Sequence, residues 1–198
     1  MTSPISVTLT ANAARGISVQ LAMVLIVGGV IALSRRYFDL HMGVPGHTGI
    51  LWMFLLIYGR GLTDRRGTGI LIGVSTAFWG EAVGLKHTLV YNLLLYTSVG
   101  TVIDVMATIP GLRLSHPLGG LVAGATSHAA KYGFIVVHAK ALALPKKFLL
   151  VGLLKAFGYH LVFGAVGGVA AGLLLWMLLR SSRSQERKGL SRPQGMKQ

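Results

Sequence analysis

The chain has 198 residues, of which 53% are hydrophobic and only 12% are charged, and its mean hydropathy is +0.64. Several apolar runs approach the roughly 20 residues that cross a bilayer, which excludes a soluble globular domain and predicts an all-α, polytopic membrane protein. The net charge of +14 is uneven, because six of the 19 Lys and Arg residues lie in residues 180–197. Such a segment beside a membrane helix is typical of the cytoplasmic side and of contact with anionic lipid. Nucleic-acid binding is not expected, because no basic, aromatic-rich soluble domain is present.

Six apolar segments predict a bundle of six transmembrane helices within residues 1–180, followed by a basic cytoplasmic tail over residues 181–198. The expected spans are 17–33, 49–62, 68–85, 88–109, 118–144 and 148–179. The first span is followed by Arg35 and Arg36 and not by a small-residue cleavage site, so we expect it to remain in the protein. The second span is short for a bilayer, which predicts that other parts of the protein partly cover it.

The placement of Lys and Arg predicts the orientation of the bundle. With both termini in the cytoplasm, eleven of these residues lie on the cytoplasmic side and five on the outer side. Without the tail the count is five against five, so the orientation depends on the tail. It places the loop LHMGVPGHTG, residues 40–49, on the outer side.

The loop of residues 40–49 contains two histidines, His41 and His47. Together with the neighbouring methionine they are possible ligands for a soft or borderline metal. Their spacing is not diagnostic, and the intervening Gly-Val-Pro-Gly favours a tight turn. We expect a loop that gates a substrate, with a metal site as the minority alternative. No resident cofactor is expected.

Charged side chains inside the predicted spans are candidates for function, since they are costly in lipid and tend to face a cavity or a partner. Lys131 lies at the middle of the fifth span, and His128 shares its face three residues earlier. Lys131 is expected to bind an anionic or carbonyl group, or alternatively to pair with Asp104 or Glu81. Asp104 itself is expected to pair with Arg60 or Arg113.

Further candidates lie near the outer ends of the third and fourth spans. Glu81 is expected either to contact a ligand or to form an ion pair at the end of its helix. Tyr91 and Asn92 are candidates to hydrogen-bond a solute. Trp52 and Trp79 are expected to anchor helices at the membrane interface, or alternatively to stack on a flat ligand.

Stripes of small residues four apart predict close helix contacts, because apolar side chains alone do not drive helices together in lipid. The stripes are Gly28-Ala32, Gly69-Gly73-Ala77, Gly120-Gly124 and Gly164-Gly168-Gly172. Packing within the bundle is the main expectation, and docking of another subunit is the alternative.

The stretch GVPGHTGILWMFLLIYGRGLTDRRGTGILIGV resembles the loop, second helix and third helix of the substrate-binding S components of energy-coupling factor (ECF) transporters. The resemblance implies a six-helix bundle that captures a vitamin, a vitamin precursor or a metal ion, with a gating loop at residues 37–48. It implies a membrane coupling subunit and ATPase subunits as partners. It also implies that Gly28 and Ala32 contact the coupling subunit. The N-terminal Met-His pair of the nickel and cobalt branch has no counterpart, since the chain begins Met-Thr-Ser.

The expected function is therefore solute binding for uptake, in the cell inner membrane, without catalysis. Membrane di-iron motifs, a GxSG-type nucleophile and a P-loop are absent from the sequence. Three alternatives remain open. They are an intramembrane enzyme using Glu81, His128 and Lys131, a structural subunit of a membrane complex, and a nickel or cobalt uptake component.

Overall fold

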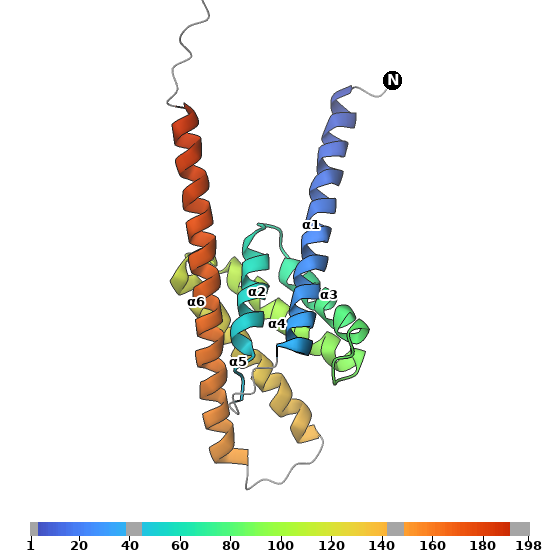
Figure 1. Cartoon of the computed structure of the whole chain (residues 1–198), viewed down its shortest axis with the longest axis vertical. Helices are drawn as coiled ribbons and strands as arrows, with labels where there is room; N and C mark the ends of the chain where they lie inside the picture. Colours follow the sequence, from blue (N-terminus) through green and yellow to red (C-terminus); the bar gives the residue numbers. More distant parts are fainter. Residues whose placement is uncertain (1–3, 39–44, 142–148, 191–198) are drawn as a thin grey trace, which may run out of the picture.

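A computed structural model of the chain describes residues 4–38, 45–141 and 149–190, and these residues form six α-helices (Figure 1). The helices are α1 (Pro4–Tyr37), α2 (Gly49–Gly61), α3 (Thr68–Ala82), α4 (Leu89–Thr108), α5 (Pro117–Ala141) and α6 (Leu149–Leu190). The all-α class expected from composition is confirmed. His41 and Met42 of the loop after α1 lie outside the described residues.

The short helix α2 lies at the centre of the bundle. It contacts each of the other five helices, whereas α1, α3, α4, α5 and α6 pack in that order, each against the next, around it. Helices α1 and α6 are the two longest, and their N-terminal and C-terminal ends respectively project from the same end of the body (Figure 1). The central position explains how a helix of 13 residues remains buried, as the sequence predicted for this segment.

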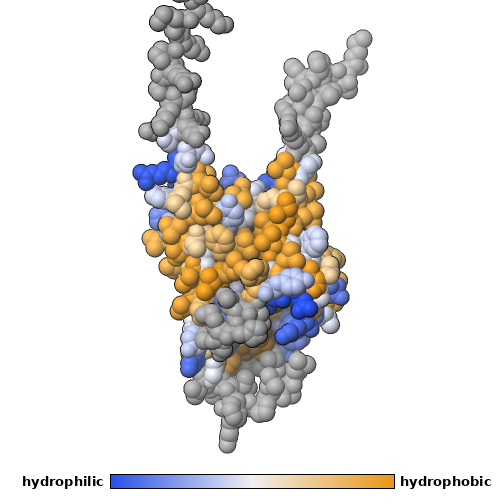
Figure 2. All heavy atoms as spheres, viewed as in Figure 1, coloured by the Kyte–Doolittle hydropathy of each residue, from blue (hydrophilic) through white to orange (hydrophobic). Residues whose placement is uncertain are grey.

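Three of the described helices contain segments that are long and apolar enough to cross a membrane: Gly16–Tyr37, Leu89–Thr108 and Gly152–Ser182. Figure 2 shows hydrophobic residues forming a band across this face, with hydrophilic residues on either side of it. This arrangement indicates a multi-pass membrane protein. Helices α2 and α3 have only 13 and 15 residues, and α5 contains several polar residues, so crossing by all six helices stays a prediction.

The helix boundaries differ from the expected spans at three places. Helix α1 begins at Pro4, so residues 4–16, which precede the expected span, also belong to the first helix. Helix α3 ends at Ala82 because Gly84 adopts a φ of 71° and the Leu85 N–H donates to the Gly80 carbonyl, which closes the helix. Helix α6 continues to Leu190, so the segment expected as a tail from residue 181 begins as helix.

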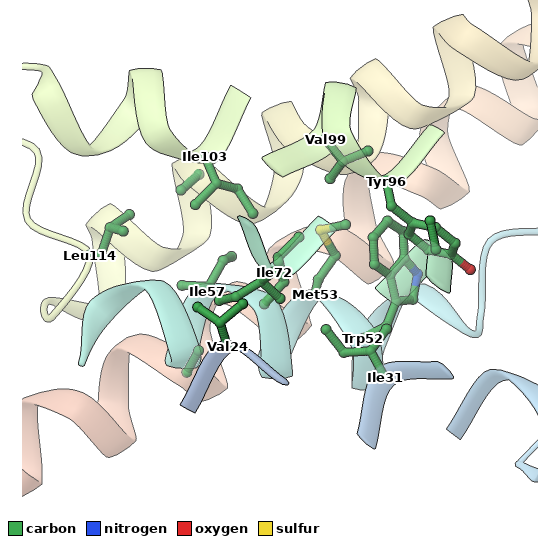
Figure 3. Close-up of a cluster of buried hydrophobic side chains, with 14 residues drawn as sticks. Val24, Ile31, Trp52, Met53, Ile57, Ile72, Tyr96, Val99, Ile103 and Leu114 are labelled. Atoms are coloured by element: carbon green, nitrogen blue, oxygen red, sulfur yellow. The ribbon is translucent and has the colours of Figure 1, made fainter. Parts of the chain in front are cut away.

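The hydrophobic core joins α1, α2, α3 and α4 (Figure 3). Trp52 and Met53 of α2 are almost completely buried, together with Ile31 of α1, Ile72 of α3 and Val99 of α4. The core therefore forms around the central helix α2. Packing against α2 positions the helices that line the cavity described below.

The glycine stripes pack helices against one another inside the bundle. A Cβ atom on Gly124 of α5 would collide with the carbonyl oxygen of Gly164 on α6, and one on Gly100 of α4 would collide with that of Gly69 on α3. Only glycine permits such backbone contact, and close contact of this kind holds helices together in lipid. The stripes on α3, α5 and α6 thus serve the internal packing that the sequence favoured.

A buried ion pair connects α2 with α4, as expected for Asp104. One Asp104 carboxylate oxygen accepts from Arg60 Nε, and the other accepts from the Ile70 backbone N–H at 3.0 Å. Arg60 also donates to the Thr63 carbonyl at 2.6 Å, beyond the end of α2. The pair fixes the α2–α3 turn against α4 at the end of the bundle from which α1 and α6 project (Figure 1).

Candidate ligand-binding cavity

A cavity of about 500 Å³ opens at the opposite end of the bundle from the Arg60–Asp104 pair. Five parts of the chain form it: the C-terminal end of α1, the residue before α2, the segment between α3 and α4, the first half of α4, and α5. The lining residues are Arg35, Arg36, Tyr37, Thr48, Gly84, Leu85, Lys86, His87, Tyr91, Asn92, Leu95, Tyr96, Lys131 and Ile135. Its volume lies within the range of small-molecule sites in proteins, which is about 300–1,000 Å³.

The lining of the cavity is strongly cationic. Arg35, Arg36 and Lys86 carry positive charges, Lys131 adds a further one when its ammonium group is protonated, and the described lining contains no aspartate or glutamate. These cations come from three separate elements, so the fold brings together charges that are distant in sequence. The cavity therefore carries an excess of positive charge at one end of a membrane bundle.

Lys131 is the most buried of these cations, with 5% of its surface exposed. Its Nζ lies 4.8 Å from the centroid of the Trp52 ring, and no hydrogen bond or ion pair of Lys131 occurs among the described residues. The alternative interpretation of Lys131 was that its ammonium group pairs with a carboxylate. Asp104 is instead bound to Arg60, and Glu81 is exposed and lies outside the cavity lining.

Arg35 connects the end of α1 to the start of α2. Its Nη1 donates to Thr48 Oγ1 at 3.2 Å, immediately before α2 begins. Its Nε is buried and has no acceptor within the part of the chain that the structure describes. The guanidinium group is thus held in place by one hydroxyl group while part of its donor capacity remains unused.

Aromatic rings cover one side of the cavity. Tyr91 lies 4.4 Å from His87 and 4.9 Å from His138, measured between ring centroids, and the buried Tyr96 ring packs edge-on against Trp52. Asn92 donates to the His87 carbonyl at 2.9 Å, which fixes the segment between α3 and α4.

His87 lies at the rim of this aromatic side, outside the membrane-spanning segments. Burial, followed by the positive charges of Arg35, His138 and Lys86, lowers the pKa of His87 below its ordinary value of 6.5. His87 is therefore mostly neutral at pH 7.

Two histidines of α5 and α6 support the loop that precedes α2. His128 Nδ1 lies 2.8 Å from the His160 carbonyl oxygen and so donates to it, which leaves Nε2 of the neutral ring as a buried acceptor without a partner in the described structure. A Cβ on Gly49 would collide with the His128 ring. A Cβ on Gly46, whose φ is 86°, would lie 3.0 Å from the His160 ring. The glycines of this loop are therefore needed for close contact with the two rings.

The structure brings only part of the predicted site together. Tyr91, Asn92 and Lys131 line the cavity, and Trp52 lies against Lys131 Nζ. His128 packs edge-on against Trp52 but is not among the lining residues.

The other predicted residues lie elsewhere. Trp79 is 44% exposed on the outside of α3, and Glu81 is also exposed. Neither residue is among those that line the cavity. His47 lines a smaller, largely apolar cavity of about 190 Å³ between α1, α2 and α6. His41 cannot be placed, because it lies outside the described residues.

Gly28 and Ala32 are buried within the chain. A Cβ on Gly28 would collide with Ser75 of α3, and Ala32 has no exposed surface. The partner contact expected at these two positions stays a prediction, and in this structure internal packing occupies both of them.

Sequence reasoning missed Arg35, Arg36, His87 and Tyr96 as cavity residues. The two arginines were interpreted only as charges that mark the end of a span. A signal was present, since two adjacent arginines at a predicted outer end oppose the positive-inside tendency and so call for another explanation.

No metal centre is found in the described part of the chain, which has no group of three or more His, Cys, Asp or Glu residues arranged around a common point. His41 and His47 therefore remain only an untested pair.

Comparisons with protein families, with curated proteins and with solved structures find no match to this chain.

Proposed function

We propose that this protein is a membrane-embedded solute-binding subunit that captures a small molecule for uptake. The observation that supports this proposal best is the cavity of about 500 Å³ lined by the buried Lys131, which has no hydrogen bond or ion pair with any residue that the structure describes. A buried charge without a partner destabilises a membrane protein, so such residues are usually retained for function. A vitamin, a vitamin precursor or a similar small molecule fits the size of the cavity.

Uptake also requires an energy source that this chain does not supply, since its sequence contains no P-loop. We propose that a separate membrane coupling subunit and ATPase subunits provide it, as the resemblance to S components implies. Both termini would lie in the cytoplasm, where the basic C-terminal segment would contact anionic lipid. The cavity would then open toward the outer side, where the solute arrives.

The intramembrane-enzyme alternative is less well supported. It requires Glu81, His128 and Lys131 to act on one substrate, but neither Glu81 nor His128 lines the cavity that contains Lys131. The structural-subunit alternative depended on free glycine stripes, and the stripes on α3, α5 and α6 are used in internal packing. A nickel or cobalt solute lacks a described cluster of ligands.

Native mass spectrometry of the protein purified in mild detergent tests the proposal. We expect a bound small molecule in the wild-type protein, its loss in K131Q, and its retention in K155Q, because Lys155 is exposed on α6 outside the cavity. Co-purification with a coupling subunit from the native membrane would support the proposed partners. If no bound molecule is found and a chemically diverse library gives no thermal stabilisation, the proposal is wrong.

A further inference from the structure

We propose that the solute is a small organic anion, whose carboxylate or phosphate group contacts Lys131 and Arg35 while its organic part lies against the aromatic side of the cavity. This inference rests on the proposed function and adds the chemical class of the ligand. Three independent features of the cavity support it: its charge, its unused hydrogen-bond donors, and its size and shape.

The charge of the lining favours an anion over a neutral or cationic solute. Arg35, Arg36, Lys86 and Lys131 line the cavity, and no acidic residue within the described ranges does so. Like charges in a region of low dielectric repel one another much more strongly than in water. A cation would increase this repulsion, a neutral solute would leave it unchanged, and an anion would reduce it.

Two groups of the cavity lining are hydrogen-bond donors with unused capacity. Arg35 Nε is buried without a partner in the described structure, and Lys131 makes only a cation–π contact there, whereas the unpaired Trp52 Nε1 and His128 Nε2 belong to residues outside the lining. A guanidinium and an ammonium group donate hydrogen bonds and accept none. A carboxylate or phosphate supplies several acceptor oxygens, and charge-assisted hydrogen bonds of this kind are the stronger ones.

The size and shape of the cavity indicate that the anion has an organic part. A volume of about 500 Å³ greatly exceeds that of a water-sized inorganic ion, since a water molecule in the liquid takes up only about 30 Å³. Tyr91 and Tyr96 line the same cavity beside His87 and provide flat apolar surfaces. A planar or ring-containing body would pack on these surfaces while its charged group reaches Lys131.

Trp52 provides a reporter at the buried end of the site, because its ring centroid lies 4.8 Å from Lys131 Nζ. The chain has three tryptophans, and the other two, Trp79 and Trp176, are 44% and 41% exposed. The double variant W79F/W176F therefore leaves Trp52 as the only tryptophan with little disturbance of the core. Its emission and the thermal unfolding of the protein are then followed while probes are added.

The probes differ in charge but share a ring. They are phthalate, phenyl phosphate, the neutral phthalamide and the cationic benzylamine, with inorganic phosphate as a further arm. We expect saturable changes in Trp52 emission and a raised Tm with phthalate or phenyl phosphate, and binding at least about tenfold weaker for phthalamide and benzylamine. A preference between phthalate and phenyl phosphate identifies the carboxylate or the phosphate as the recognised group.

Variants of the charged residues connect the response to the cavity. K131Q and, independently, R35Q should weaken anion binding by at least about tenfold, while K155Q should leave it unchanged. Equal or tighter binding of phthalamide or benzylamine, or no saturable response to any probe, would overturn the anion inference. The proposed function would survive that result if native mass spectrometry finds a neutral or cationic molecule bound in a Lys131-dependent way.

Discussion

Replacing Lys131 with methionine should make the ligand-free protein more stable, even though it removes the proposed binding group. Lys131 lies in α5, which we predict to cross the membrane, and a lysine at the centre of a membrane helix costs about 2.5–3.5 kcal/mol. Its cation–π contact with Trp52 returns about 0.5–2 kcal/mol. Methionine is flexible and apolar and fills a similar space, so the net stabilisation is expected to be about 0.5–3 kcal/mol.

Thermal unfolding followed by tryptophan emission, in one detergent and without added ligand, measures this effect. For a protein of this size about 1 kcal/mol shifts Tm by about 2–4 °C, so the expected increase is about 1–12 °C. K155M is the matched control, since Lys155 is exposed and its replacement should change stability by less than about 0.5 kcal/mol. Stabilisation by phthalate, expected to be about 2.7 kcal/mol for the wild type at 100 times Kd, should disappear in K131M.

The opposite result would refute the reasoning. If K131M lowers stability by about 1 kcal/mol or more and phthalate binding persists, Lys131 holds the helices together and does not serve the ligand. Loss of both stability and binding would also contradict the prediction, because a residue kept only for function should not stabilise the empty protein.

Three further predictions concern other parts of the bundle. D104N should lower the unfolding free energy by about 3–5 kcal/mol, since it leaves Arg60 buried without its counter-charge, and thermal unfolding with the R60M/D104L double variant should recover part of this loss. G124A should destabilise the α5–α6 contact, whereas G133A on the same helix meets no atom within 4 Å and should be neutral or slightly stabilising; equal effects in unfolding assays would contradict the packing described above. Because the folded protein lowers the pKa of His87, its unfolded chain takes up this proton first, so stability should fall as pH decreases from about 7.5 to 5.5. H87Q should reduce that dependence, and an unchanged Tm profile would show that His87 does not contribute.

Local sequence signals predicted the helices well. Four of the six expected spans coincide with helices to within three residues at both ends, because charges, glycines and prolines mark the breaks between apolar runs. The ends that differ have local causes. The positive φ of Gly84 closes α3 early, and the polar residues after Leu179 continue α6, since the basic segment carries no strong helix-breaking residue before Gly189.

The cavity was only partly predictable, since its residues come from elements distant in sequence. Lys131, Tyr91 and Asn92 were identified because polar groups in apolar spans are conspicuous. Arg35 and Arg36 are ordinary residues for a helix end. Only the three-dimensional packing of α1 beside the α3–α4 segment places them in the lining of the same cavity as Lys131. Long-range arrangements of this kind leave no periodic signal in a single sequence.

The distribution of acidic residues connects the fold with the proposed ligand. The chain has 19 Lys and Arg residues but only five Asp and Glu. At the end of the bundle from which α1 and α6 project, the chain neutralises a buried cation itself, because Asp104 accepts from Arg60. In the cavity at the other end no acidic residue joins the described lining, the exposed Asp64 and Glu81 do not reach it, and Asp39 lies outside the described residues. Among the described residues the fold thus compensates a buried cation at one end of the bundle and leaves the cations of the cavity without a carboxylate. The anionic solute that we propose would supply that counter-charge.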